Sequence, residues 1–358
     1  MQNQYDFLHL NPYLLHFRTM DTLEIELISK NYSETFVPLN AVALNQGPSS
    51  FFHWMALPLE NNTVIPQRVF FTLKNAAINR IRYYWVVDDS IVFKGETGDN
   101  FTFKERPYPF CNFTFPVQIS SRQRGVLFLE MDKRNENFFC GFDLSEERTF
   151  HRFEVRTYWI FGIFVGIIIL TIAVNLFLFF LLKDSLHLWY GLYALSNLFL
   201  LLSFDGLDFQ FIYPEVPFLS NISRYVTTGM TYILLFQLLI VFIKEGKSSV
   251  AVKILIRSFQ IIHLMLLVTS IVTFWYFQYS EWIKIFLFRS LSLLSVVSLI
   301  ALLVVSYRHY RRGHKASLLF FIAIFILLSG SIEYVLNLNG WRTGLLLFNS
   351  VIPSNMQI

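Results

Sequence analysis

Charged residues are scarce in this chain. Asp, Glu, Lys and Arg make up only 15% of its 358 residues, whereas 54% are hydrophobic and the mean hydropathy is +0.47. Such a composition excludes an ordinary soluble protein of this length. The formal net charge of +4 is small, and the cations cluster beside apolar runs. This placement favours membrane topology and argues against nucleic-acid binding.

Cysteine is almost absent. The two cysteines, Cys111 and Cys140, both lie in the less apolar first part of the chain. No C-x-x-C or Cys/His spacing predicts a zinc site. In an extracytoplasmic domain the two thiols are candidates for a disulfide. The alternative is a pair of unpaired small core residues.

Catalytic motifs are missing as well. The sequence has no H-E-x-x-H, no G-x-S-x-G and no Gly-rich phosphate loop. Asp205 and Asp208 have the spacing of a D-x-x-D metal pair, but Gly206 and the following prolines argue against a long helix that would align them. We therefore expect no enzyme activity, no cofactor and no metal site.

Long apolar runs dominate the chain from Tyr158 onward. A membrane-spanning helix needs about 20 mostly apolar residues, and six such runs occur. They lie near 158–182, 188–204, 225–243, 254–277, 283–306 and 316–336. We expect residues 1–150 to form a separate domain and residues 151–358 to form a helical membrane domain.

The loops between these runs differ in charge. Those after the first, third and fifth runs are basic, most clearly YRHYRRGHK (Tyr307–Lys315), whereas the others carry Asp205, Asp208 and Glu281. Basic loops stay in the cytoplasm. This pattern predicts an extracytoplasmic N-terminal domain, although two arginines precede the first run.

The two ends of the sequence do not match this topology. MQNQYDFLHLNPYLLHFRTMD lacks the basic start and unbroken apolar core of a signal peptide. The last stretch, TGLLLFNSVIPSNMQI, is too short and too interrupted by Pro353 to span a membrane. Because export of the first domain needs a signal, trimming of the sequence at both ends would resolve both mismatches, and the alternative is a real truncation.

The first 150 residues favour β-structure. Four segments are rich in aromatic and β-branched residues, with a turn at 88–90 between the second segment and IVFKG. These segments are Arg68–Asn75, Ile81–Val87, Asn112–Ile119 and Gly125–Met131. Their spacing predicts an antiparallel sandwich or jelly roll. No long helical period is evident here.

Several aromatic residues of this domain are candidates for stacking on a sugar, namely Trp54, Tyr83, Tyr84 and Trp85. Successive strand residues point to opposite faces, so at most half of Tyr83–Trp85 can share a surface. We take Trp54, Tyr84 and Trp85 as the ligand-binding candidates. The alternative is that they are ordinary core residues.

Polar residues inside the apolar runs are costly and often functional. Arg289 and Glu333 lie at comparable depth from the outer side, and we expect them to form an ion pair. The alternative is that each side chain reaches the outer interface independently. His263 is expected to pack in the bundle without binding a metal.

Three segments of the sequence resemble the bacterial seven-transmembrane receptors with diverse intracellular signalling modules. They are RPYPFCNFTFPVQI (Arg106–Ile119), the block from Asn175 to Pro214, and NSVIPSN (Asn349–Asn355). The resemblance covers most of the chain from about Thr22. It implies a jelly-roll sensor domain, related in shape to carbohydrate-binding modules, followed by seven helices and a cytoplasmic output module. The chain ends where the seventh span would begin.

The favoured function is therefore a sensory receptor of the bacterial inner (cytoplasmic) membrane. An outer β domain would bind a small molecule or carbohydrate, and the helices would relay a change inward. The bilayer is the expected partner, a homodimer is a further candidate, and no nucleic acid is expected. The alternatives are a non-catalytic membrane adaptor and a transporter with an accessory outer domain.

One loop is the expected relay. Asp205, Asp208 and Tyr213 follow the second apolar run on the side opposite the basic loops, beneath the expected β domain. We expect them to dock that domain and to pass on its movement.

Overall fold

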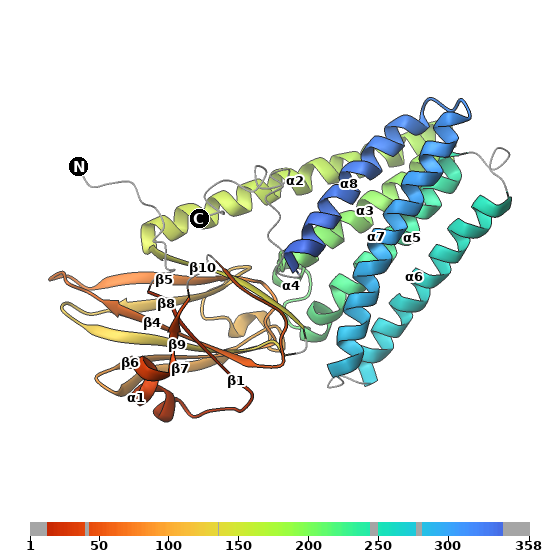
Figure 1. Cartoon of the computed structure of the whole chain (residues 1–358). Coiled ribbons are helices and arrows are strands. Elements are labelled where there is room, and N and C mark those ends of the chain that lie inside the picture. The colour runs from red at the N-terminus through yellow and green to blue at the C-terminus, as the bar shows by residue number, and fades with distance from the viewer. Residues whose placement is uncertain (1–12, 40–42, 135, 244–249, 277–280, 339–358) are drawn as a thin grey trace. The chain divides into compact units, whose positions relative to one another are not determined.

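A computed structural model describes residues 13–39, 43–134, 136–243, 250–276 and 281–338. The chain divides into two compact units. The first contains the chain up to Trp159 together with Asp205–Asn221, and the second contains Ile160–Phe204 and the chain from Ile222 onward. The first unit is built on a β-sandwich and the second is a bundle of apolar helices (Figure 1).

The sandwich consists of a six-stranded and a four-stranded antiparallel sheet. The strands are β1 (Leu15–Thr19), β2 (Val37–Pro38), β3 (Ala43–Pro48), β4 (Phe52–Glu60), β5 (Gln67–Lys74), β6 (Arg80–Val87), β7 (Ser90–Thr97), β8 (Phe113–Ile119), β9 (Arg124–Asp132) and β10 (Asn137–Glu146). The strand orders are β2-β1-β4-β9-β6-β7 and β3-β10-β5-β8. The main core lies between the sheets, where apolar side chains of both are buried together.

The four segments predicted as strands are β5, β6, β8 and β9. The predicted turn at 88–90 is the β6–β7 hairpin, in which Asp88 and Asp89 both have positive φ (48° and 57°). Two positive φ angles in succession are what a two-residue hairpin requires, and Asp tolerates them better than most residues.

The domain also contains one short helix, which the sequence did not reveal because it gives no long helical period. α1 (Ile25–Thr35) covers the outer face of the six-stranded sheet, where Ile25 and Ile28 pack with Trp54 and Phe128. The helix is short and only its buried face is apolar. Its helical pattern of apolar residues is therefore hard to recognise in the sequence beside segments with a strand pattern. As a result β4 is buried on both faces over its first six residues.

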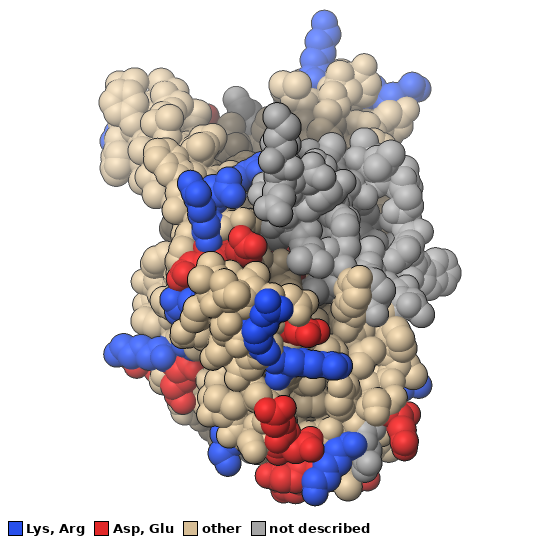
Figure 2. Space-filling model, turned by 90° about the vertical axis from the view of Figure 1, so that its left-hand side faces the viewer, with Lys and Arg blue, Asp and Glu red and all other residues tan. Residues whose placement is uncertain are grey.

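The charged surface of the sandwich mixes both signs. In the view of Figure 2 the Lys/Arg and Asp/Glu side chains lie close together on the lower part of the molecule. The ion pairs of the sandwich include Arg68–Glu147 at 2.8 Å and Lys74–Asp143 at 2.8 Å. Several cations of this unit therefore find acids within it.

The apolar helices coincide with the six predicted runs. They are α2 (Glu147–Leu182), α3 (Ser185–Phe204), α5 (Pro217–Phe242), α6 (Val250–Tyr276), α7 (Glu281–Arg311) and α8 (Ser317–Leu338). In the described part, five helices, α2, α3, α5, α6 and α7, have the length and composition to cross a membrane. α8 has a shorter apolar stretch, Ser317–Ile332.

α2 starts eleven residues before the first predicted run, at Glu147. Its 36 residues extend roughly 54 Å, well beyond a hydrocarbon core of about 30 Å. The extra turns pack on the sandwich, because the ring of Phe150 stacks on Phe70 at 4.5 Å. The sequence misplaces this start because the first turns are polar and lie outside the apolar run.

Candidate functional site

The segment between α3 and α5 belongs to the β-sandwich unit. It is Asp205–Asn221, called here the docked segment, and it contains the short helix α4 (Leu207–Phe211) and the first residues of α5. α3 runs into it and α5 continues from it. The segment is therefore a covalent connection between the sandwich unit and two helices of the other unit.

Gly206 lets this segment approach the sandwich closely. It precedes α4 with φ +69°, and a Cβ at this position would lie 2.7 Å from Cβ of Ala76. Residues with a side chain rarely adopt this φ, and the space is already filled. The glycine that argued against a long helix is thus a contact point with the β5–β6 loop.

Asp208 organises the docked segment from within. Its carboxylate is buried and accepts hydrogen bonds from the backbone N–H of Phe209, at 2.7 Å, and from the hydroxyl of Tyr213. Its carbonyl also accepts the N–H of Ile212 at 2.8 Å. Asp208 and Tyr213 are therefore bonded to each other within this loop, and their role in a relay stays a prediction.

Asp205 has a different environment. It is exposed, and its negative charge adds to the burial that raises the pKa of the Cys111 thiol to about 12. The two aspartates therefore differ in environment, since Asp208 is buried and Asp205 is exposed.

Arg106 is the centre of the contact. Its guanidinium donates to the carbonyls of Ala76 (3.2 Å), Phe110 (3.0 Å) and Cys111 (2.6 Å). The same group lies over the rings of Phe103 at 4.7 Å, Phe113 at 4.2 Å and Phe209 at 5.8 Å. A buried cation held by carbonyls and aromatic faces ties the β5–β6 loop and the β7–β8 connection to α4.

Direct bonds complete the docking. The ring of Phe209 is fully buried and meets Phe103 edge-on at 5.7 Å, and the N–H of Phe103 donates to the carbonyl of Pro214 at 2.8 Å. Gln210 Nε2 donates to the carbonyl of Pro109 at 3.3 Å and to the hydroxyl of Tyr158 on α2 at 2.8 Å. Both aromatic and backbone contacts therefore fix α4 in place.

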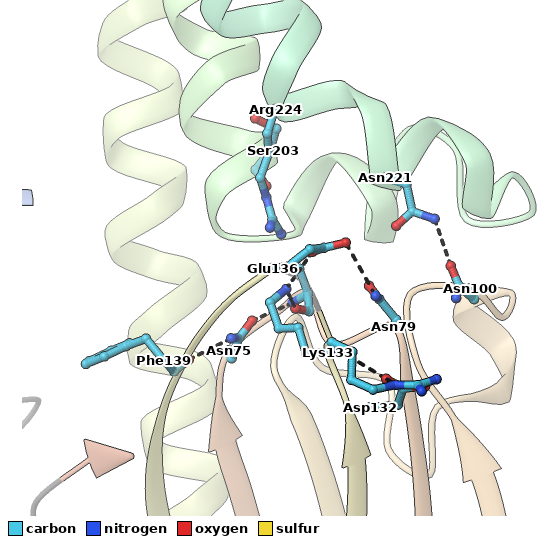
Figure 3. A network of polar contacts seen from close by, with 12 residues as sticks. Asn75, Asn79, Asn100, Asp132, Lys133, Glu136, Phe139, Ser203, Asn221 and Arg224 are labelled. Atoms are coloured by element: carbon cyan, nitrogen blue, oxygen red, sulfur yellow. Dashed lines mark hydrogen bonds and ion pairs between the residues drawn. The ribbon is translucent and has the colours of Figure 1, made fainter. Parts of the chain in front are cut away.

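The edge of this contact is polar. Asn221 Nδ2 donates to Asn100 Oδ1 at 2.9 Å (Figure 3). An exposed ion pair joins Lys104 to Glu215. Exposed pairs of this kind contribute little free energy. They therefore help to position the docked segment more than they stabilise its contact with the sandwich.

The sandwich loops beneath the segment are braced by their own polar network. Lys133 is buried and pairs with Glu136 at 3.2 Å, while Asn79 Nδ2 donates to Glu136 Oε1 at 3.4 Å (Figure 3). Asn75 Nδ2 donates to the carbonyl of Phe139 at 2.7 Å. These bonds link the β5–β6 and β9–β10 loops and hold the docking surface in one shape.

In the helical unit, α5 makes polar contacts with its neighbours. Towards α3, the hydroxyls of Thr231 and Ser196 are 2.9 Å apart, and Arg224 Nε donates to the carbonyl of Ser203 at 3.0 Å. Towards the later helices, Tyr232 stacks on His263 of α6 at 5.0 Å. Tyr232 also packs against an apolar cluster that includes side chains of α7 and α8, and its hydroxyl interacts with Ser295 and Ser331. A shift of α5 would thus be felt by four other helices.

The aromatic candidates need a correction. Trp54 and Trp85 are fully buried and Tyr84 is nearly so, which means that none offers an open stacking surface. Trp85 points into the core between the sheets, whereas Trp54 and Tyr84 stack at 6.3 Å on the opposite face beneath α1. The alternation of strand residues correctly separates Tyr84 from Trp85, but the covering helix was not foreseen.

A row of polar groups borders those two aromatics. Glu130 lies directly across from Trp54 on one side and from Arg82 on the other. Arg82 Nε approaches Glu130 Oε2 at 2.5 Å as an ion pair, yet both carboxylate oxygens and Trp54 Nε1 lack a hydrogen-bond partner in the described part. Burial raises the pKa of Glu130 to about 7, against the opposing effect of Arg82.

The expected disulfide is not formed. Cys111 and Cys140 are both free and buried. Cys140 lies in β10 and Cys111 directly precedes β8, with β5 between these two strands. Two strand spacings are roughly 9–10 Å, more than the ~7 Å between Cα atoms that a disulfide can bridge.

The predicted intramembrane pair stays a prediction. Arg289 is exposed on α7, and the side chain of Glu333 lies outside the described residues. His263 is buried, and its Nδ1 donates to the carbonyl of Phe259 at 2.9 Å.

Sequence reasoning missed Arg106 and Phe209 as parts of the site. Arg106 opens the segment RPYPFC, so the available signal was an arginine set among prolines and aromatics. Phe209 looked like one more apolar residue at the end of a span. Only the fold places it beside Arg106.

Two regions of the chain match known families. Residues 157–357 match the family described as 7TM diverse intracellular signalling, and residues 17–139 match the one described as 7TMR-DISM extracellular 2. The first match alone covers more than half of the chain. No curated protein matches the chain.

Proposed function

This chain belongs to the 7TM diverse intracellular signalling family, and from that premise we propose that its docked segment passes ligand binding from the sandwich to α5. The family makes it a multi-pass membrane receptor with an extracellular N-terminal sensor domain. The finer proposal concerns the route, the ligand and the output. We assign the receptor to the bacterial inner membrane and its output to a cytoplasmic module.

The observation that carries the route is the position of the docked segment. Its residues are folded into the sandwich unit by Gly206, Phe209 and Gln210, and its last residues are the first turn of α5. A displacement of the sandwich loops must therefore move the start of α5. Because α5 contacts α3, α6, α7 and α8, two packings of the bundle that differ in α5 would be biased by the ligand.

The polar row on the six-stranded sheet supports a ligand with hydroxyl groups. A donor without a hydrogen-bond partner in the described part, Trp54 Nε1, stands across from Glu130, whose Oε1 has no partner there while Oε2 is in the ion pair with Arg82. A hydroxyl group both donates and accepts, so a carbohydrate or polyol fits this pair. α1 covers the neighbouring aromatics, and ligand entry would require this helix to shift.

A test of the route needs no ligand. Phe103→Ala removes the ring that meets Phe209 but leaves the strands intact. We expect faster hydrogen exchange in 205–221 and further along α5 in the full chain in detergent. Val92→Ala, on the exposed edge strand β7, is the matched control. Faster exchange confined to 100–110 would contradict the route.

A second test concerns the ligand. Thermal stability of the full chain would be measured against a panel of polyols and oligosaccharides, for the wild type and for Glu130→Gln. A stabilisation that the variant loses supports the polar row. Equal stabilisation of both proteins would place the ligand elsewhere on the sandwich.

A homodimer also remains part of the proposal. The apolar window of α2 has none of its residues buried within the structure, so this helix has a surface free for lipid or for a second copy. Cross-linking through Ile163→Cys, at an exposed position of α2, would detect the dimer.

A further inference from the structure

The turn between α7 and α8 is short and closed by its own hydrogen bonds. Gly313, with φ +93°, donates its N–H to the carbonyl of Tyr310 at 2.9 Å, and the N–H of His314 donates to the carbonyl of His309 at 3.2 Å. Ser317, the first residue of α8, donates to the carbonyl of His314 at 2.9 Å. The side chains of this turn are therefore presented from a fixed backbone.

Four cations project from the end of α7 and from the turn that follows it. They are Arg308, Arg311, Arg312 and Lys315, and all four are exposed. Among the described residues no ion pair involves any of them. In contrast with the sandwich, the helical unit offers them almost no acid, since Asp184 is its one acidic residue with a described side chain.

A histidine at the end of α7 also lacks hydrogen-bond partners in the described part of the chain. His309 is 1% exposed, and neither of its ring nitrogens has a hydrogen-bond partner in the described part of the chain. Its ring centroid is 5.9 Å from that of His314. A buried imidazole without any partner is costly, and an acceptor supplied from outside the chain would remove the cost.

Two tyrosines near the turn indicate how deep it lies in the membrane. Tyr307 is 47% exposed and Tyr310 is 37% exposed, one turn or less from the cations. Tyrosine concentrates at the level of lipid headgroups. With the N-terminal domain outside, the five spanning helices bring the end of α7 to the cytoplasmic side.

We propose that the α7–α8 turn binds the phosphate groups of anionic lipids in the cytoplasmic leaflet. The four exposed cations supply charge-assisted donors to the headgroup phosphate. Phosphate is the chemistry these groups recognise, because guanidinium groups bind it with two parallel hydrogen bonds. Lipid is the source, since the turn lies at headgroup depth. The bound lipid would hold the ends of α7 and α8 in register.

Topology alone also accounts for basic loops in the cytoplasm, so the test must measure lipid binding. The full chain would be placed in nanodiscs of phosphatidylcholine with rising phosphatidylglycerol, and the retained anionic lipids counted by native mass spectrometry. We expect the phosphatidylglycerol concentration at half-saturation to rise about five-fold for each cation removed. The double variant Arg311→Gln with Arg312→Gln should therefore raise it about 25-fold.

Two control variants keep this result interpretable. Arg311→Lys with Arg312→Lys retains charge and should keep most of the binding, which also shows that the turn still folds. Arg148→Gln with Arg156→Gln removes two exposed cations from the N-terminal part of α2 and should change nothing. Equal lipid retention by the Gln pair and the wild type would overturn the proposal.

A final arm separates lipid from free phosphate. Hydrogen exchange in 308–317 would be compared with phosphatidylglycerol present and with inorganic phosphate at the same concentration. We expect protection from the lipid only. Equal protection by inorganic phosphate would overturn the assignment to the leaflet.

Discussion

At the scale of single residues, the docking surface depends on one buried guanidinium. Arg106 donates to three backbone carbonyls and lies over three aromatic rings. Neither a neutral side chain nor the flexible ammonium group of lysine reproduces that set of contacts. The residue therefore combines a structural role with the proposed relay.

We expect Arg106→Lys to lower the free energy of unfolding of the sandwich unit by roughly 2 to 4 kcal/mol, because buried carbonyls lose their donors. Chemical denaturation of the full chain in detergent, followed by tryptophan fluorescence, measures the change. Arg148→Lys, at an exposed position, should leave the curve in place. If both variants unfold alike, the guanidinium contacts are not important for stability.

Glu130 should make stability depend on pH. Its folded pKa of about 7 is above the ordinary 4.5, so the folded state holds the proton more tightly. The stabilisation is complete below pH 4.5 and is lost as the pH rises through 7. By this linkage the loss is on the order of 3 kcal/mol.

Glu130→Gln should therefore gain apparent Tm over the wild type as the pH rises from 5 to 8, with Glu60→Gln, exposed on β4, as control. Burial lowers the pKa of His16 to about 4 and of His53 to about 3, which destabilises the protein as the pH falls. Comparing the two proteins at each pH cancels this opposite effect. A Tm difference that stays constant with pH would exclude a raised pKa of Glu130.

At the scale of elements, α5 has polar contacts with several helices, and Tyr232 connects it to α6, α7 and α8. Hydrogen bonds between membrane helices contribute about 0.6 to 2 kcal/mol each. The helix thus depends on a few side chains for its position in the bundle.

We expect Tyr232→Phe to lower the thermal stability of the purified full chain in detergent, since the ring still stacks but the hydroxyl bonds are lost. Ser331→Ala should cost less in the Tyr232→Phe background than alone, which a double-mutant cycle measures. Tyr276→Phe, at an exposed position on α6, serves as control. Additive effects of the two substitutions would mean that the hydroxyls do not interact.

At the scale of the whole molecule, the family match makes the sandwich extracellular, and we expect the α7–α8 turn to lie on the cytoplasmic side. The two native cysteines suit a labelling experiment, because burial raises the pKa of both thiols and neither is exposed. A thiol held in its neutral, buried form reacts slowly with maleimides. The wild type therefore provides a low background.

Val92→Cys, on the exposed edge strand, should react with an impermeant maleimide on intact cells. Ala316→Cys, exposed in the α7–α8 turn, should react only after the membrane is opened. Labelling of Ala316→Cys on intact cells would reverse the orientation. Equal labelling of the wild type would mean that a native thiol becomes accessible.

The sequence by itself determined the six apolar helices and the β class of the first domain, because both follow from local composition and period. Charge at the end of an apolar run also locates the loop of Asp205, Asp208 and Tyr213 at the membrane edge, whereas its role as a relay stays a prediction.

Only the tertiary structure decided which residues meet. Arg106 and Phe209 are more than 100 positions apart, α1 hides Trp54 and Tyr84, and β5 keeps Cys111 from Cys140. These outcomes depend on which strands pair and on what covers each face. Such pairings arise from packing between distant segments, which no local pattern encodes.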